Sequence, residues 1–337
     1  MAAKDDPGVL AVATENRPRP ELNPETHAED VSDLCAIEAR WSRLEPVPEP
    51  TREILDEHLG DWPSLREQRW TLLAGGLRSW NLRSGDRVAR IARDGPDSEG
   101  ARTLEKEAAL LERMSEDLCV PRIIALGPSA LILEYVPHEP LPATAQAGEA
   151  VGRAAARIGR LRFEDAGMLD SELAVAEPFV SALDGLAEWI GGLLEDGAGR
   201  RLGPELRSAV VTLLHAARPR LEAAQGEPRL CHSDFKPTNV HWLPERQDVL
   251  VLDWEFAWSG PALFDLAMML RWSPPEPFVA GLVRGYQQES DEPLPDDWRR
   301  VTGWWDLHNL LGFLGREDLD PVCEQDVLRR VRELVEA

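Results

Sequence analysis

Two short apolar runs that lead into polar side chains most constrain what this chain can fold into. Residues 230–240 read LCHSDFKPTNV, an apolar entry, a polar turn and an apolar exit, and residues 250–255 read LVLDWE. Asp234 can accept the proton of an attacking hydroxyl, while Asn239 and Asp253 are hard oxygen ligands for Mg²⁺ on nucleotide phosphates. The pattern therefore predicts phosphoryl transfer from a magnesium-bound nucleotide.

A length of 337 residues suggests two lobes with a large core. Cys35, Cys119, Cys231 and Cys323 are scattered and form no C-x-x-C pair, which favours reduced thiols over a zinc site or a disulfide framework. No run approaches the roughly 18 apolar residues of a membrane span, and residues 9–13 are too short for the apolar core of a signal peptide. We expect a cytoplasmic protein without a membrane partner.

The charge balance bears on partners. The net charge of −23 disfavours nucleic acid and anionic membranes, which bind basic surfaces. It would attract a cationic small molecule, although plain solubility also explains it. Lysine occurs only at Lys4, Lys106 and Lys236, so a lysine inside a motif, such as Lys236, is notable.

Residues 1–47 are rich in Pro, Glu, Asp and Ala, and we expect a flexible extension with one short helix at 33–44. Residues 48–136 are predicted to form a small lobe. It begins with a helix at 51–59, followed by strands near 69–73, 80–82, 88–92, 123–127 and 130–137 and one helix before the last two strands. Gly75 and Gly76 lie between the first two strands, where backbone N–H groups can cover phosphates, although an ordinary turn explains such a pair equally well.

An ion pair is predicted between strand and helix in this lobe. Arg90 shares one face of the strand at 88–92 with apolar side chains, and a cation there needs an anionic partner. In the helix that follows, Glu107 is the only charge in a stripe of apolar residues spaced by three and four. We expect an Arg90–Glu107 pair that fixes a cation on nucleotide phosphates, with Arg93 and Glu105 as the alternatives.

Residues 137–337 are predicted to be mostly helical. Pro219 should kink or cap the helix that it falls in. The expected helices span 145–161, 178–194, 204–224, 261–271, 278–288, 298–314 and 324–335.

Together these residues resemble the aminoglycoside phosphotransferase/choline kinase-like family over about residues 65–315. Residues 232–239 look like the kinase catalytic loop, His-x-Asp-x-x-x-x-Asn, and residues 252–255 look like the metal-binding motif of this family. Gly260 and the DLA of residues 265–267 resemble its next signature. The resemblance implies an α+β, bilobal protein-kinase-like fold, with a small antiparallel-sheet N-lobe carrying one main helix and a larger, mostly helical C-lobe.

The resemblance also implies a role for each matched residue. Asp234 would be the catalytic base, Lys236 would contact the γ-phosphate, and Asn239 and Asp253 would hold Mg²⁺. Asp265 would order the catalytic loop near His232. The implied cofactors are ATP (or GTP) and Mg²⁺. The nucleotide would meet Arg90 in place of the usual lysine, with Glu107 as its helix partner, Gly75 and Gly76 over the phosphates, and the backbones of Glu134 and Val136 at the adenine.

Two departures from the family pattern are Ser233, where Gly is common, and Arg162, where His is frequent. Only eleven residues separate Asp253 from Asp265, too few for the activation segment that cradles a peptide, so we expect a small acceptor. Core packing is the alternative for each acceptor-site candidate, of which the sequence offers Glu255, Trp272, Trp304, Trp305, Asp306, His308 and Asn309.

We therefore expect an ATP-dependent kinase that phosphorylates a hydroxyl of a small molecule, with an aminoglycoside-like or other cationic acceptor favoured by the charge. The alternatives are a metabolic kinase of a sugar, homoserine or a choline-like molecule, and a catalytically silent kinase-like binding protein.

Overall fold

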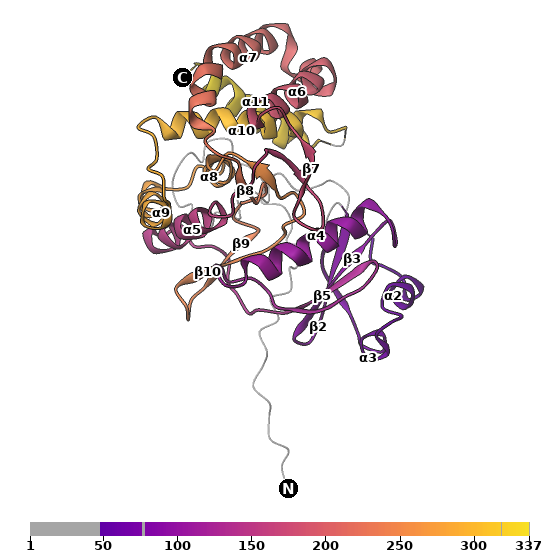
Figure 1. Cartoon of the computed structure of the whole chain (residues 1–337). Coiled ribbons are helices and arrows are strands. Elements are labelled where there is room, and N and C mark those ends of the chain that lie inside the picture. Colours follow the sequence, from indigo (N-terminus) through magenta and orange to yellow (C-terminus); the bar gives the residue numbers. More distant parts are fainter. Residues whose placement is uncertain (1–47, 76–77, 318, 337) are drawn as a thin grey trace. The chain divides into compact units, whose positions relative to one another are not determined.

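The computed structural model describes residues 48–75, 78–317 and 319–336 (Figure 1). The predicted extension of residues 1–47, with its helix at 33–44, lies outside them, as does Gly76. The described chain is bilobal, as the sequence predicts, with an N-lobe built on one sheet and a larger C-lobe that is mainly helical. A linker of residues 135–144 joins the lobes, and we propose the boundary between them near residue 136.

The N-lobe sheet has five antiparallel strands in the order β1-β2-β3-β5-β4. Alternation along β3 separates its two faces, because Ala89 and Ile91 pack with Leu59 and Leu65 beneath the first helices, whereas Arg90 lies on the opposite face. The N-lobe elements are α2 (Arg52–His58), α3 (Pro63–Arg66), β1 (Thr71–Gly75), β2 (Ser79–Ser84), β3 (Arg87–Ala92), α4 (Glu99–Met114), β4 (Ile123–Leu126) and β5 (Ala130–Glu134).

Helix α4 covers the face of the sheet that carries Arg90. Ser98 caps it by accepting a hydrogen bond from the N–H of Ala101. The predicted apolar stripe is buried, and Glu107 is buried within it. The helix buries more than the stripe, however, because Lys106 is also only 7% exposed.

The C-lobe contains six short strands among its helices, where the sequence predicted helices almost throughout. They form a four-stranded sheet, β7-β6-β11-β8, and a hairpin, β9-β10. The C-lobe elements are α5 (Ala145–Ile158), β6 (Gly167–Leu169), β7 (Val175–Pro178), α6 (Ala182–Glu195), α7 (Gly197–Ala224), β8 (Arg229–Cys231), β9 (Val240–Leu243), β10 (Asp248–Val251), β11 (Trp258–Gly260), α8 (Leu263–Leu270), α9 (Glu276–Glu289), α10 (Trp298–Gly315) and α11 (Pro321–Glu336).

The chain at two prolines differs from the prediction. Pro178 ends β7, where it lies opposite Gly167 of β6, so α6 begins only at Ala182. Helix α7 runs through Pro219, and its one break in helical geometry lies at Gly203. Pro219 is tolerated because that turn is exposed, so water can bind the carbonyl that the ring leaves without a donor.

Helices α5 and α9 cross at backbone contact. A Cβ added at Gly281 of α9 would lie 2.0 Å from the carbonyl oxygen of Ala145, and one at Gly152 of α5 would lie 2.0 Å from that of Leu282. Similar clashes would occur at Gly148 and Gly285. Only glycine permits this crossing, which fixes the first long helix after the linker to the rest of the C-lobe.

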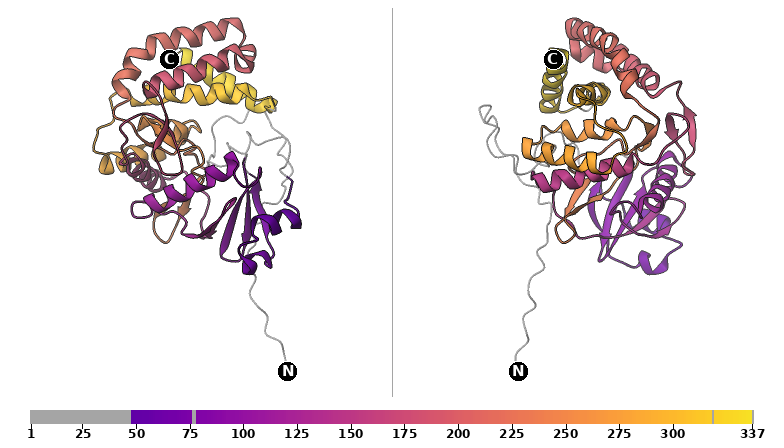
Figure 2. Two further views of the ribbon diagram at one scale, coloured as in Figure 1. Left: turned by 45° about the vertical axis from the view of Figure 1, so that its right-hand side comes forward. Right: turned by 60° about the vertical axis from the view of Figure 1, so that its left-hand side comes forward.

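A second hydrophobic core, around Leu307 and Leu311 of α10, joins the terminal helices α6, α7, α10 and α11. Figure 2 shows these rose and yellow helices together at the end of the C-lobe away from the sheet. None of the described helices has the length and apolar character needed to cross a membrane.

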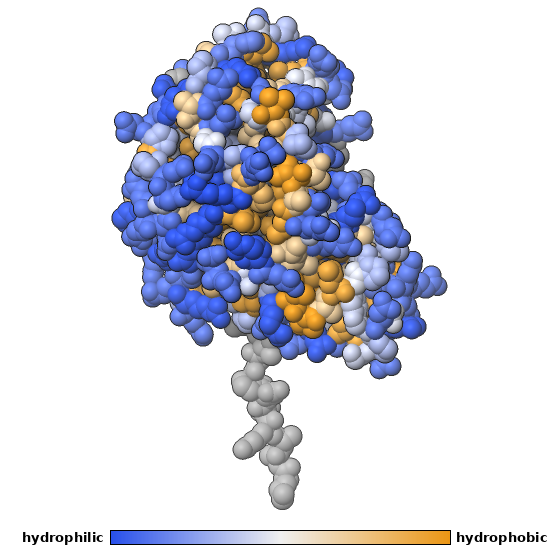
Figure 3. Space-filling model, viewed as in Figure 1, coloured by the Kyte–Doolittle hydropathy of each residue, from blue (hydrophilic) through white to orange (hydrophobic). Residues whose placement is uncertain are grey.

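The surface is mainly hydrophilic, with an apolar band that crosses the face shown in Figure 3. Large apolar side chains are exposed on both lobes, among them Leu126 of β4, 45% exposed, and Trp189 of α6, 46% exposed. They are spread over several elements.

Candidate active site

The loop between β8 and β9 is anchored by Asp265. Its carboxylate accepts hydrogen bonds from the backbone N–H groups of His232, at 2.8 Å, and Ser233, at 2.9 Å, which confirms the predicted ordering role. Burial raises the pKa of Asp265 to about 7, although these two donors act in the opposite direction. Ser233 has φ of 66°, in the left-handed region that favours glycine, which explains the preference for Gly at this position.

His232 ties the loop to the segment that follows β10. Its Nε2 lies 2.9 Å from the carbonyl oxygen of Leu252, and its Nδ1 lies 3.2 Å from the backbone N–H of Asp234. Burial lowers the pKa of His232, so the ring is neutral. A neutral imidazole that donates from Nε2 and accepts at Nδ1 satisfies both contacts.

Asp234 receives two side-chain donors on one oxygen. Asn239 Nδ2 lies 2.7 Å from Asp234 Oδ2 and 3.0 Å from its carbonyl oxygen, while Lys236 Nζ lies 3.0 Å from the same Oδ2. The Asp234 side chain is still 16% exposed, so the carboxylate is open to a bound molecule. Because the amide nitrogen of Asn239 is used in this way, its Oδ1 points elsewhere.

Asp253 is brought beside this loop by the backbone. The N–H of Leu252 donates to the carbonyl oxygen of Asn239 at 2.9 Å. Asp253 itself has φ of 68°, an uncommon geometry for a non-glycine residue. Its side chain is 29% exposed and accepts from Arg90, with 2.7 Å between Nη2 and Oδ1. Burial alone would raise the pKa of Asp253, but the Arg90 charge lowers it.

Arg90 links the two lobes at this point. Its Nη1 lies 2.8 Å from Glu107 Oε1, which is the predicted ion pair, while Nη2 reaches Asp253. Burial raises the pKa of Glu107 to about 7, against the effect of Arg90. The two carboxylates raise the pKa of Arg90 although burial alone would lower it. The guanidinium is thus held between a helix carboxylate in one lobe and a loop carboxylate in the other.

The donor set fits a magnesium ion bound together with phosphate. The amide oxygen of Asn239 and the second carboxylate oxygen of Asp253 are hard ligands, and the contacts with Asp234 and Arg90 use the other atoms of these side chains, Asn239 Nδ2 and Asp253 Oδ1. No three His, Cys, Asp or Glu side chains in that part of the chain are grouped to hold a metal by themselves. Such a site would therefore need oxygens from a ligand or water.

The predicted hinge follows β5. The backbone N–H of Tyr135 donates to the carbonyl oxygen of Asp86 at 2.8 Å, and His138 Nδ1 lies 2.7 Å from the carbonyl oxygen of Val136. The carboxylate of Glu134 faces outward and pairs with Arg122 at 3.2 Å. Gly75 ends β1, whereas its neighbour Gly76 is outside the described residues. Nucleotide contacts at these positions stay predictions.

Three charged residues near this site had no predicted role in nucleotide binding. Lys106 donates to the carbonyl oxygen of Ala257 at 3.1 Å. Glu255, considered above only for the acceptor, is 8% exposed, and burial, together with the neighbouring Asp253, raises its pKa to about 7. Arg78 follows the predicted phosphate-covering loop and pairs with Glu99 of α4. The rarity of lysine was the one signal that pointed to Lys106.

Several acceptor-site candidates are structural instead. Trp272 and Trp305 are each 1% exposed and belong to hydrophobic cores. Asp306 is buried with Arg271, with 2.8 Å between Oδ2 and Nε. His308 packs on Phe264, with ring centroids 4.5 Å apart. Helix α10 is packed by α6, α7, α8 and α11 on several sides, so core packing is the correct interpretation of Trp305, Asp306 and His308.

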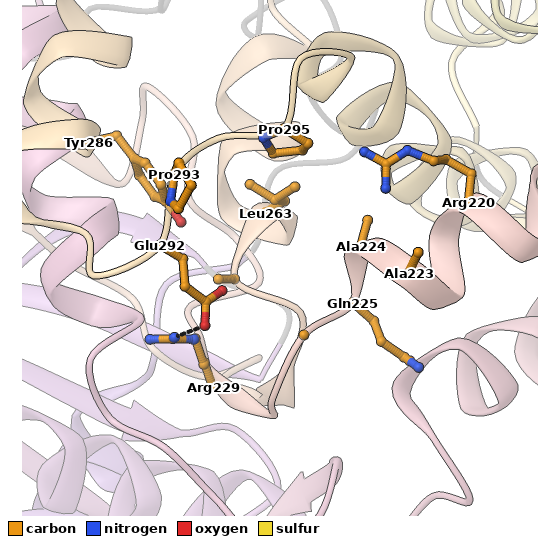
Figure 4. A pocket seen from close by; sticks show the side chains of 12 residues that line it. Arg220, Ala223, Ala224, Gln225, Arg229, Leu263, Tyr286, Glu292, Pro293 and Pro295 are labelled. Atoms are coloured by element: carbon orange, nitrogen blue, oxygen red, sulfur yellow. Dashed lines mark hydrogen bonds and ion pairs between the residues drawn. The ribbon is translucent and has the colours of Figure 1, made fainter.

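A cavity of about 170 Å³ lies at the start of β8 and not at the catalytic loop (Figure 4). Its charged side chains are paired, Arg229 with Glu292 at 2.6 Å and Arg220 with Asp297 at 2.5 Å. Arg229 also donates to the carbonyl oxygen of Gly159. The charged residues that line this cavity therefore hold neighbouring elements of the C-lobe together.

Comparison with known families decides the class of protein. The sequence model of the phosphotransferase enzyme family, APH, matches residues 69–304, which run from just before β1 into α10 and include the loops of Asp234, Asn239 and Asp253. The chain belongs to this family. It is therefore a phosphotransferase, as the sequence motifs predicted. No curated protein matches the sequence.

Solved structures similar to this phosphotransferase show the same fold. A GDP complex of wild-type aminoglycoside 2'-phosphotransferase-IIIa is 17% identical, with a TM-score of 0.65 over 86% of this chain and 99% of that one. A choline/ethanolamine kinase family protein from Mesorhizobium loti is 16% identical, with a TM-score of 0.61 over 85% and 94%. The macrolide 2'-phosphotransferase MphH from Brachybacterium faecium is 18% identical, with a TM-score of 0.57 over 75% and 90%.

Proposed function

We propose that this phosphotransferase transfers the γ-phosphate of ATP or GTP to a hydroxyl group of a small molecule. The observation that carries the proposal is the convergence of three side chains at the lobe junction. Asn239 holds the Asp234 carboxylate, and its backbone holds the segment that carries Asp253. The GDP bound to the aminoglycoside 2'-phosphotransferase-IIIa of the comparison supports a nucleotide as donor.

In this proposal Asp234 is the base. Its carboxylate accepts the proton of the acceptor hydroxyl, and the two donors from Asn239 and Lys236 fix the oxygen that does not take it. Lys236 also places a positive charge within 3.0 Å of that carboxylate, from where it can approach the transferred phosphoryl group. Burial and the donors to the loop keep these groups in place before the nucleotide binds, which reduces the reorganisation needed.

Mg²⁺ would be held by Asn239 Oδ1 and Asp253, and when bound it would neutralise charge on the phosphates. Arg90 would contact the phosphates from the N-lobe. Arg90 Nη2 already lies 2.7 Å from Asp253 Oδ1, so a phosphate bound by Arg90 would share that donor with Asp253. Arg and Lys bind phosphate differently, and the planar guanidinium can serve Glu107 and a phosphate at the same time.

We propose a cationic or polyhydroxylated acceptor. The net charge of −23 favours a cation, and the compared structures are named for aminoglycosides, macrolides and choline or ethanolamine. A metabolic kinase of a sugar, homoserine or a choline-like molecule is the second candidate within the class. A catalytically silent protein is disfavoured, because both proposed metal ligands and the proposed base are present. A cytoplasmic location without membrane or nucleic-acid partners completes the proposal.

The test is ADP release from Mg-ATP, and GDP release from Mg-GTP, over a panel of aminoglycosides, macrolides, amino alcohols and sugars. With the best acceptor, Asp234→Asn should lower kcat by about 10²–10⁴-fold and leave nucleotide affinity near that of the wild type, because only the proton acceptor is lost. Asp86→Asn is the matched control, since that side chain is 92% exposed. Full turnover by Asp234→Asn would refute the assignment of the base. Absence of nucleotide binding by the wild type would refute the proposed function.

A further inference from the structure

Helix α4 buries two charged side chains in succession, and the function proposed above uses only one of them. Glu107 binds Arg90. Lys106, 7% exposed, is directed to the segment after Asp253, where its Nζ donates to the carbonyl oxygen of Ala257 at 3.1 Å. Ala257 is itself fully buried. A lysine is seldom buried in this way without a partner that needs it.

The carbonyl that Lys106 binds belongs to a turn. The N–H of Ala257 donates to the carbonyl oxygen of Trp254 at 3.1 Å, which closes the turn that follows Asp253. β11 then begins at Trp258. Burial lowers the pKa of Lys106 to about 8, and the nearby Arg78 acts in the same direction, while Glu255 and Glu107 oppose both. Lys106 therefore supplies the hydrogen-bond donor for the carbonyl oxygen at the end of this turn. The carboxylates of Glu255 and Glu107 offset part of the cost of burying its charge.

Helix α4 contacts the segment from Asp253 to Ala257 by two separate routes. One route runs from Glu107 through Arg90 to Asp253, with distances of 2.8 and 2.7 Å. The other runs directly from Lys106 to Ala257. The helix thus holds the segment at two points, one at the proposed metal ligand and one at the end of the turn behind it.

The two routes differ in what a ligand would do to them. On the proposed function, a bound phosphate shares the Arg90 donor that reaches Asp253 Oδ1, and Mg²⁺ on the other oxygen withdraws charge from the same carboxylate, so the Arg90–Asp253 contact weakens when the site fills. Lys106 and Ala257 are not proposed ligands of the nucleotide or metal, and their contact can persist. We propose that Lys106 is a positioning residue that keeps the Asp253 segment against α4 in the nucleotide-bound protein and thereby sets the affinity for metal-bound nucleotide.

The experiment compares nucleotide binding with and without metal in the full-length protein. Lys106→Met keeps the length of the side chain and removes the donor. Isothermal titration with ATP in Mg²⁺ and with ATP in EDTA gives two dissociation constants for each variant. Loss of a group that orients a metal ligand typically lowers metal affinity by about 10- to 100-fold, so the Mg-ATP affinity should fall by that factor while metal-free ATP affinity stays within about twofold.

Two controls make the result specific. Arg102→Met removes an exposed cation one turn earlier on the same helix, where it donates to the carbonyl oxygen of Asp97, and should leave both constants unchanged. Lys106→Arg keeps a charged donor and should restore most of the Mg-ATP affinity. If Lys106→Met does not fold, Lys106→Gln takes its place.

The outcomes separate this inference from the proposed function on which it rests. Wild-type protein that binds no nucleotide would refute the proposed function. Wild-type protein that binds Mg-ATP, with a Lys106→Met variant that loses affinity equally with and without Mg²⁺ or not at all, would refute only the role of Lys106. A loss confined to the metal-bound nucleotide supports it, because a general destabilisation of the lobe would lower both affinities.

Discussion

Replacing Arg90 by methionine removes the positive charge that Glu107 and Asp253 share. The side chains of Arg90 and Glu107 are 7% and 2% exposed, so the change leaves Glu107 buried without its cation. Breaking a buried pair in this way costs about 3–5 kcal/mol of folding free energy. The pKa of Glu107 is already raised to about 7, so protonation relieves part of the penalty and we expect the lower end of that range, about 3 kcal/mol.

The reverse change should cost less. In Glu107→Gln, Arg90 keeps Asp253 at 2.7 Å, and the amide oxygen can still accept one hydrogen bond. We expect a loss of about 1 kcal/mol, the net value of one hydrogen bond. In the double variant no buried carboxylate is left alone on α4, so its cost should be well below the sum of the two single changes.

Urea denaturation at pH 7.5 measures all three variants, with the fluorescence of the chain's 12 tryptophans as the signal. The free energy of unfolding should fall strongly in Arg90→Met and slightly in Glu107→Gln. The loss in the double variant should be smaller than the sum of the two single losses by about 1–3 kcal/mol. Equal costs for the two single variants, or strict additivity in the double variant, would refute the idea that one guanidinium neutralises both carboxylates.

Two further predictions concern stability alone. Gly281→Ala should destabilise the fold by at least about 1–3 kcal/mol, since its Cβ would lie 2.0 Å from the Ala145 carbonyl oxygen. Gly191→Ala, at an exposed position of α6 where a Cβ would meet nothing within 4 Å, should be neutral or stabilising by up to about 1 kcal/mol. Melting temperatures check both variants, and equal shifts would contradict the close crossing. Burial, with a smaller effect of Arg271, lowers the pKa of His308 from 6.5 to about 3. As the pH falls below 6.5, the imidazole is therefore protonated in the unfolded chain while it stays neutral in the folded protein. This difference should lower the free energy of unfolding by about 2 kcal/mol at pH 5. His308→Phe should remove that part of the acid sensitivity in urea titrations at pH 7.5 and 5, and an unchanged pH slope would show that His308 is not a buried neutral base.

The site residues that the sequence could predict are those that follow a strict period or a motif of fixed spacing. Arg90 alternates with core residues on a strand and Glu107 interrupts an apolar helical stripe, so their pairing follows from geometry. The order of Asp234, Asn239 and Asp253 places them on adjacent loops of any fold that pairs the flanking strands. Asp265 could be predicted for the same reason.

Other features depend on packing that no local pattern shows. Lys106 lies next to the stripe of α4, where a lysine ordinarily reaches solvent, and its burial depends on a turn that is distant in sequence. Strands such as β6 and β8 have three residues each, too few to show alternation. The burial of Trp305 and His308 follows from neighbours on several sides of α10 at once.

The crossing of α5 and α9 bears on how this protein can move. Glycines place the two backbones in contact, so neither helix can slide by a residue without a steric clash. Because α5 starts directly after Thr144, this contact makes the C-lobe a fixed block up to the end of the linker. Glu139 of the linker pairs with Trp242 of β9, so a change in the angle between the lobes must come from rotations in the linker before that residue. It must also exchange the contacts that cross between the lobes, among them those of Arg90, the Lys106–Ala257 hydrogen bond and the bridge between Cys119 and Leu250.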